Sequence, residues 1–262
     1  MGGAERNQRK RRQAQQAAPP PVATARKAPV DGKRIAIAVA VVIAVGAIIA
    51  GFVYSDSVKN ATEGESIAVV PSTLDVPVSR DGAVVTVGRD DARVTIDVYE
   101  DFLCPACRSF EEEHGDDIER AVADGDARVR YHLINLLAER SDPPGYSTDA
   151  ATAALLAADA GVFPAFHKSL FAAQPDEDAR GWDREQLIAL GAALGTTDPA
   201  FADGVRSGAL GDVVAAEYER ARTTDSLLRD RGGERLFATP TVAAGGVLVD
   251  TADDAWLAKL LG

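Results

Sequence analysis

The stretch VTIDVYEDFLCPAC, residues 94–107, indicates more about this fold than any other part of the sequence. Its start alternates apolar and polar side chains, which is typical of a half-buried strand. Its end places Cys104 and Cys107 around a Pro-Ala dipeptide, and a proline suits the first position of a helix. Free backbone N–H groups and the helix dipole stabilise a thiolate at such a place, and the thiolate is the attacking species in disulfide exchange. We therefore predict that the two cysteines form a redox-active pair.

The cysteine pair has two other possible roles, a structural disulfide and half of a zinc site. A structural disulfide between residues three apart closes too small a loop to constrain the chain much. Half of a zinc site needs two further ligands, and the chain has no other cysteine and only three histidines, which are scattered. His114 would lie about 15 Å from Cys104 along the helix axis, too far to act as its base. His132 and His167 are interpreted as packing or surface residues, so no metal and no cofactor beyond the disulfide is expected.

A membrane anchor is predicted at residues 35–54, which carry no charge and are long enough to span a bilayer as a helix. Residues 1–34 hold nine Lys or Arg against two acids, so the positive-inside rule places the N-terminus in the cytoplasm. A cleaved signal peptide is the alternative, but its apolar core is usually only about 7–15 residues. We favour an uncleaved, single-pass anchor in the cell membrane, with the C-terminal part outside the cytoplasm.

Charge divides at the same boundary. The first 34 residues carry a net +7, and because the whole chain carries −12, the remainder carries −19. Such an acidic domain argues against nucleic acid as a partner. The Gln-, Ala- and Pro-containing tail, residues 1–34, is expected to be disordered. Residues 55–81 are interpreted as a stalk with at most one short strand, and residues 82–262 as one domain.

The pattern along the domain predicts an α/β fold. Strands are expected at 83–87, 93–99 and 129–137, helices at 105–123 and 251–261, and a hairpin at 241–249. Helical signals fill about 146–233, with starts at Ser147 or Thr148, at Pro164, at Asp183 and at Asp198, and with a long last helix leading to residues 232–233. Without this helical block, the order is that of a thioredoxin-like sheet.

Three segments strengthen this interpretation. Residues 99–107 (YEDFLCPAC) resemble the active-site segment of the DsbA-like thioredoxin family, in the branch with an Asp-Phe-x-Cys-Pro-x-Cys signature. Residues 163–171 (FPAFHKSLF) are similar to that branch's helical insert, and residues 238–242 (ATPTV) to its cis-proline loop. The likeness covers about 83–262 and implies a thioredoxin-like fold with a helical insertion at about 146–233.

The resemblance also implies roles for individual residues. Cys104 is the exposed nucleophile with a depressed pKa, and Cys107 is the buried resolving thiol. Pro105 and Ala106 separate them. Thr239 and Pro240 pack beside the disulfide, and a cis bond at the proline turns the backbone of Thr239 toward an extended substrate.

Two departures from the family pattern stand out. An acidic residue often lies six positions before the first cysteine, but here that position is Val98. Asp97 should point to the other face of the strand and Glu100 lies nearer the loop, so proton handling by a buried carboxylate is not expected. Ala106 replaces the histidine of the strongest oxidants, which predicts a weaker oxidant.

The sequence thus predicts a membrane-anchored, extracytoplasmic thiol–disulfide oxidase that donates its disulfide to exported proteins with thiols, and we expect it to be a monomer. By resemblance, a quinone-linked DsbB-like or VKOR-like membrane protein reoxidises it. The alternatives are a reductase of exported or cytochrome-maturation thiols, whose usual members lack so large an insert, and a non-catalytic thioredoxin-like binding or chaperone domain. An isomerase normally dimerises through a separate domain, which the short stalk does not offer.

Overall fold

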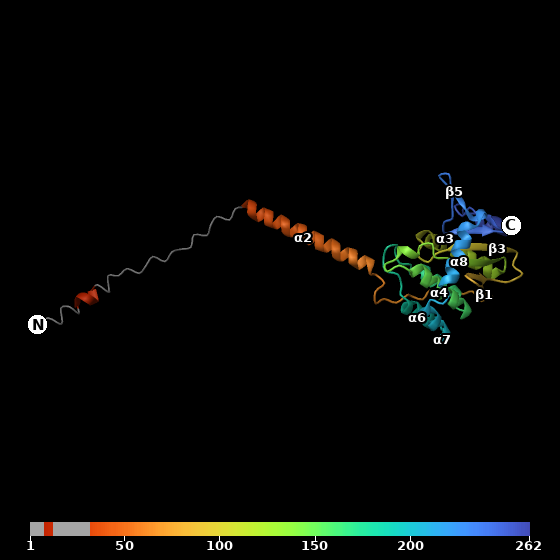
Figure 1. The fold of residues 1–262 in the computed structure, drawn as a ribbon, viewed down its shortest axis with the longest axis horizontal. Helices are drawn as coiled ribbons and strands as arrows, with labels where there is room; N and C mark the ends of the chain where they lie inside the picture. Colours follow the sequence, from red (N-terminus) through yellow and green to blue (C-terminus); the bar gives the residue numbers. More distant parts are fainter. Residues whose placement is uncertain (1–7, 13–31) are drawn as a thin grey trace. The chain divides into compact units, whose positions relative to one another are not determined.

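The computed structural model describes residues 8–12 and 32–262, and the chain divides into two compact units, Met1–Phe52 and Val53–Gly262. Residues 8–12 are helical, and the rest of the tail up to residue 31 lies outside the described residues. Helix α2 (Gly32–Lys59) follows (Figure 1). Among the described residues, one helical stretch, Val39–Lys59, is long and apolar enough to cross a membrane. It overlaps the predicted anchor over residues 39–54.

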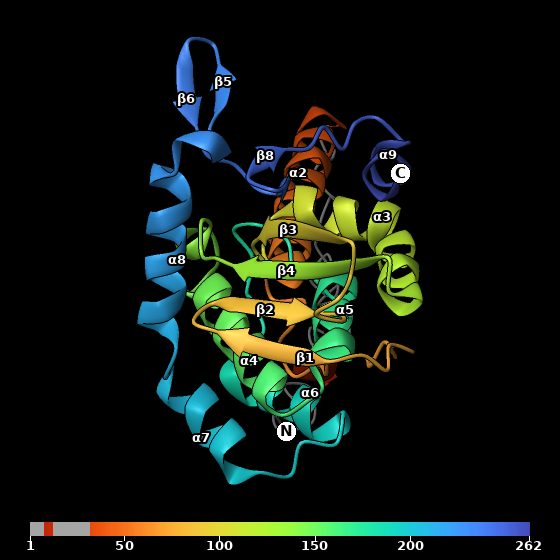
Figure 2. The same ribbon diagram turned by 90° about the vertical axis from the view of Figure 1, so that its right-hand side faces the viewer.

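The second unit is built on a six-stranded sheet with the strand order β1-β2-β4-β3-β7-β8 (Figure 2). Only β3 and β4 pair in parallel, and the other neighbours are antiparallel. The strands are β1 (Val78–Asp81), β2 (Val84–Val87), β3 (Val94–Glu100), β4 (Ala127–Leu133), β7 (Thr241–Ala244) and β8 (Val247–Leu248). This is the predicted thioredoxin-like sheet.

The helices follow the expected order. They are α3 (Pro105–Asp124), α4 (Tyr146–Asp159), α5 (Phe163–Ala172), α6 (Arg184–Ala193), α7 (Pro199–Ser207), α8 (Gly211–Thr223) and α9 (Trp256–Leu261), with short 3-10 turns at Ala138–Arg140 and Asp225–Leu227. The capping box predicted from Asp183 and Gln186 is present, because each side chain bonds the other's backbone N–H. Helices α4–α8 form the insertion between β4 and β7.

The two faces of the sheet differ in character. Val98 pairs in register with Tyr131 and Val242, so these side chains share one face, which packs on the main core. Asp97 pairs with Arg130 and Ala243 on the opposite face, where Tyr99 and Ala243 pack with Ala221 of α8. The alternation of β3 therefore separates an apolar side from one that carries charged groups.

The end of the insertion differs from the prediction. The last helix does not reach residues 232–233 but ends at Thr223, and a separate hairpin, β5 (Arg229–Arg231) with β6 (Glu234–Leu236), projects beyond it (Figure 2). Gly232 and Gly233 have φ of 67° and 92°, and two consecutive left-handed residues form a two-residue hairpin turn rather than a helix.

The segment expected to be a stalk lies against the domain. The Thr62 hydroxyl donates to the carbonyl oxygen of Arg180 at 3.0 Å, and Ile67 is only 6% exposed. Farther along, the backbone N–H of Val70 donates to the hydroxyl of Ser169 at 2.8 Å. The sequence did not predict this packing, because the segment has no regular apolar face and is held to the domain by single side chains.

Candidate active site

The cysteine pair lies at the point where β3 leaves the sheet and α3 begins. Cys104 is the N-cap of α3 with an extended backbone, and Pro105 occupies the first helical position. The carbonyl oxygen of Cys104 accepts hydrogen bonds from the backbone N–H groups of Cys107 at 3.0 Å and Arg108 at 3.2 Å. Cys104 is only 7% exposed, less than the exposed position that the resemblance implied, and Cys107 is fully buried. Of the two cysteines, Cys104 is therefore the more accessible to a substrate.

The two thiols have opposite acidities. The side chain of Cys107 hydrogen-bonds the Cys104 sulfur and lowers its pKa to about 6, with help from the backbone N–H groups of Cys107 and Ala106 and against the effect of burial. Burial raises the pKa of Cys107 well above its usual value, and the neighbouring Cys104 raises it further. At neutral pH Cys104 is the thiolate, and Cys107 keeps its proton.

The predicted proline loop lies beside Cys104. The peptide bond between Thr239 and Pro240 is cis, as predicted. The Cys104 sulfur is 3.6 Å from the carbonyl oxygen of Thr239, and the buried Oγ1 of Thr239 has no hydrogen-bond partner among the described residues. Pro105 and Ala106, between the two cysteines, are exposed. The structure thus brings the six predicted site residues together.

A buried carboxylate does lie beside the cysteines, contrary to the expectation from Val98. Glu100 is 1% exposed, and burial, followed by the proximity of Cys104, raises its pKa well above the ordinary value. Residues 98 and 100 share a face of β3, because side chains alternate along a strand. The two-residue alternation of β3 was the signal that could have identified Glu100.

His167 of α5 is a hydrogen-bond partner of Glu100. Its Nε2 forms a short hydrogen bond with Oε1 of Glu100, and its ring packs among Phe102, Tyr131 and Phe171. The sequence predicted only a packing or surface role for this histidine. Its carboxylate partner lies 67 positions away, and nothing in the local sequence signals such a contact.

Asp101 shapes the loop before the cysteines. Its carboxylate accepts hydrogen bonds from the backbone N–H groups of Leu103 and Leu137, both at 2.8 Å, and from the hydroxyl of Ser147 at 2.7 Å. Burial raises its pKa to about 6. Gln174, which follows α5, donates from Nε2 to the carbonyl oxygen of Cys104 at 3.0 Å. Both contacts tie the active-site loop to the insertion, and the sequence interpretation missed them.

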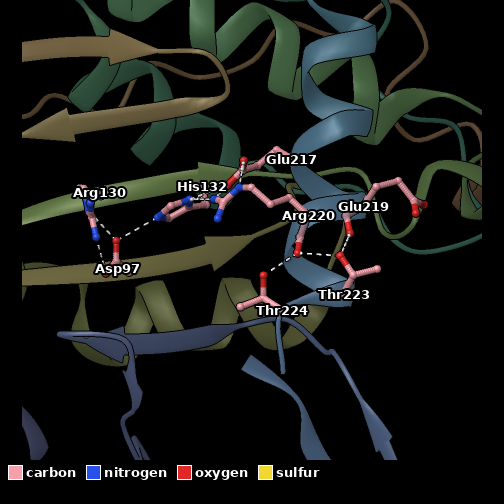
Figure 3. Close-up of polar contacts among 8 residues, drawn as sticks. All are labelled: Asp97, Arg130, His132, Glu217, Glu219, Arg220, Thr223 and Thr224. Atoms are coloured by element: carbon pink, nitrogen blue, oxygen red, sulfur yellow. Dashed lines mark hydrogen bonds and ion pairs between the residues drawn. The ribbon is translucent and has the colours of Figure 1, made fainter. Parts of the chain in front are cut away.

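A second polar group lies on the opposite face of the sheet (Figure 3). Nε2 of His132 is 2.9 Å from Oδ1 of Asp97, and Nδ1 is 2.6 Å from Oε1 of Glu217 on α8. Arg130 donates to Asp97 at 2.7 Å and Arg220 to Glu217 at 2.9 Å. Asp97 points away from the cysteine side, as predicted. His132 is buried in a charged network that joins the sheet to α8, and so it is neither a surface nor a simple packing residue.

Comparisons with known proteins agree with this geometry. A family model described as Thioredoxin matches residues 80–261. The reduced DsbA from Mycobacterium tuberculosis superimposes with a TM-score of 0.57 at 26% identity, over 69% of this chain and 93% of that one. The reduced disulfide bond oxidoreductase DsbG of the same organism gives 0.54 at 27% identity, over 67% and 83%.

A curated relative is found among protein kinases. The serine/threonine-protein kinase PknE of Mycobacterium tuberculosis is 33% identical over 194 residues, which are 72% of this chain. The chain spans about a third of the length of the curated relatives it matches.

Proposed function

The chain belongs to the DsbA-like thioredoxin family of thiol–disulfide oxidoreductases, and we propose that it works as an extracytoplasmic oxidase anchored in the cell membrane. In this role the Cys104–Cys107 disulfide is passed to exported proteins. A substrate thiol loses its proton, and the resulting thiolate attacks the sulfur of Cys104 and displaces Cys107 as a thiolate, which takes up a proton in turn. A second thiolate of the same substrate then attacks the substrate sulfur of the mixed disulfide and releases Cys104 as a thiolate. The substrate loses two electrons and the cysteine pair gains them.

The acidity of Cys104 supports the direction of transfer. A thiol whose pKa is about 6 is a good leaving group, because its thiolate is stabilised. The same stabilisation lowers the free energy of the reduced pair relative to the disulfide. It therefore makes the disulfide a stronger oxidant. This single observation favours an oxidase over a reductase.

The neighbouring loop supports an extended substrate. The backbone of Thr239 lies beside the Cys104 sulfur, at the end where β7 begins. An unfolded exported chain can pair its backbone with that of Thr239, while its cysteine reaches the sulfur. Each round leaves the pair reduced, so the cycle needs an electron acceptor, for which we propose a quinone-linked DsbB-like or VKOR-like membrane protein.

The redox state of the pair in living cells tests the direction. Cells are quenched in acid, and free thiols are alkylated with a reagent that adds mass. An oxidase is expected to be mainly in the disulfide form at steady state. A mainly dithiol population would contradict the oxidase and favour the reductase of exported or cytochrome-maturation thiols.

A binding or chaperone domain is the second candidate, since a segment 33% identical to this chain over 194 residues also forms part of a serine/threonine-protein kinase, PknE. Cys104→Ser separates the two functions. Under the oxidase proposal, this variant loses all disulfide transfer to a reduced, unfolded substrate protein. Cys107→Ser is the matched variant, and it should form a lasting mixed disulfide when its Cys104 thiolate attacks a substrate protein that already carries a disulfide, because Cys107 is no longer there to resolve it. Transfer that continues in Cys104→Ser would overturn the oxidase.

A further inference from the structure

Three potential metal ligands converge behind the cysteine pair. Glu100 at the end of β3, Glu111 on α3 and His167 on α5 each place one ligand atom within 4.8 Å of the others. Three different elements supply these residues, and the mechanism above does not use Glu111 or His167. Their convergence is a property of the tertiary fold.

The cluster contains unpartnered oxygen atoms. Glu100 Oε2 and Glu111 Oε1 are buried and accept no hydrogen bond from any described residue. The basic residue nearby, Lys168, bonds Asp116 and Glu119, both at 3.0 Å, and does not serve the cluster. Buried carboxylate oxygens normally have partners, because leaving them unpaired is unfavourable. A cation would satisfy both atoms at once.

A cavity gives access to the cluster. It has a volume of about 210 Å³ and is lined by Glu111 and His167 together with apolar residues such as Tyr131 and Phe163. The exposed residues Glu112 and Asp116 also contribute to its wall. The space suffices for water molecules that complete the coordination of an ion, and the acidic wall favours entry of a cation over an anion.

We propose that Glu100, Glu111 and His167 bind a divalent transition-metal ion, for which zinc is the best match. One imidazole nitrogen, two carboxylate oxygens and a water form a tetrahedral set that zinc accepts in proteins. The ion takes the place of the proton shared between His167 and Glu100 and also reaches Glu111. Ligands of tetrahedral zinc lie about 3.4 Å apart, so His167 and Glu100, which share a short hydrogen bond, must separate, and Glu111 must approach them by up to about 1.4 Å. Glu111 can move, because no described residue hydrogen-bonds it.

The cysteine pair must be kept out of the test, since a Cys-x-x-Cys dithiol binds zinc itself. The full chain is therefore purified in detergent micelles as the Cys104→Ser/Cys107→Ser double variant, with a purification tag free of histidine. Zinc chloride is titrated by calorimetry, and the bound metal is counted after dialysis. We expect one zinc per chain and a higher unfolding temperature with zinc.

Glu111→Gln, made in the same double variant, decides whether the cluster holds the ion. It keeps the shape of the side chain but removes a charged ligand, and we expect zinc affinity to fall at least tenfold. Glu113→Gln is the matched control, because it removes the same charge from an exposed position on α3 that does not line the cavity, and its zinc affinity should remain unchanged. Thermal unfolding without zinc checks that both variants fold.

Two outcomes would overturn the proposal. One is the absence of zinc binding to the double variant at millimolar zinc. The other is equal zinc affinity in Glu111→Gln and Glu113→Gln, which would place the ion elsewhere on the acidic surface. His167→Gln gives an independent check, and it must weaken zinc binding as Glu111→Gln does.

Discussion

Cys104 combines access with acidity in a way that depends on its immediate neighbours. It caps α3, receives a hydrogen bond from Cys107 and lies next to the Thr239 carbonyl. Cys107, three positions on, is enclosed by the core. The two side chains are chemically identical, so their different accessibility and acidity come from their positions, one helical turn apart.

Alkylation of the reduced protein should follow the titration of Cys104. With a pKa of about 6, the rate of reaction with iodoacetamide is expected to reach half its maximum near pH 6, and it should fall below that pH as the thiolate is protonated. In Cys107→Ala the hydrogen bond to the thiolate is lost, so the midpoint should move to higher pH. A midpoint near pH 8.5 in the unaltered chain would contradict the assignment.

Ala106 sets a limit on oxidising strength. It offers the thiolate no charge and no side-chain hydrogen bond. Ala106→His should lower the pKa of Cys104, and each unit stabilises the thiolate by about 1.4 kcal/mol, which raises the two-electron reduction potential by about 30 mV. The measurement is equilibration of the pair with a glutathione buffer.

Ala106→Gln is the control for this substitution, because it adds bulk and polarity without charge. Its potential should lie closer to that of the unaltered chain than the potential of Ala106→His does. If both variants shift equally, the effect is steric and the electrostatic explanation is wrong.

At the scale of elements, helix α8 is joined to the sheet by charge. Burial alone would raise the pKa of Glu217, but hydrogen bonds from His132 and Arg220 lower it to about 2. A carboxyl group whose pKa falls on folding stabilises the folded state at pH values above the pKa that the group has in the unfolded chain. The contribution is complete above about pH 4.5 and disappears as the pH falls through about 2.

Glu217→Gln should therefore destabilise the domain at pH 7, by on the order of 2–4 kcal/mol, because Arg220 and His132 lose a charged partner. The stability of the variant should also fall less as the pH drops from about 4.5 to about 2, because Glu217 is no longer there to be protonated. Urea unfolding followed by the fluorescence of Trp182 and Trp256 measures both effects, since these two buried residues are the only tryptophans. Glu219→Gln, on the same helix with the exposed partner Arg222, should leave stability unchanged.

Local signals predicted most of the elements. The alternation in β3, the proline that opens α3 and the capping box of α6 are encoded within a few residues, and the structure agrees with all three. The cluster of Glu100, Glu111 and His167 could not be predicted in this way. Its members belong to three elements, and only the packing of α3 and α5 against the sheet brings them together.

Two other differences have the same kind of cause. The glycines at 232–233 suggested the end of a helix, but they can equally form the turn of a hairpin, and the local sequence does not distinguish these outcomes. Segment 60–77 has no regular apolar face, so its contacts with Arg180 and Ser169 became visible only in three dimensions.

At the scale of the whole molecule, the proposed topology separates a basic tail from an acidic domain. In intact cells, a membrane-impermeant maleimide should label reduced Cys104 from outside. In a Cys104→Ser/Cys107→Ser background, Gln8→Cys places a single thiol in the tail, and this thiol should be labelled only after the membrane is permeabilised. Labelling of Gln8→Cys in intact cells would contradict the orientation. Resistance of the chain to carbonate extraction checks that it is inserted.

The active site contains both of the cysteines in the sequence. The domain therefore reaches its folded state without forming a disulfide elsewhere, and it has no second pair with which the active-site sulfurs could scramble. If the chain is the exported oxidase proposed above, a newly exported molecule can fold before any other oxidant has acted on it. It would then depend on a reoxidant for turnover and not for its own maturation, and any mixed disulfide that it forms must involve its reacting sulfurs.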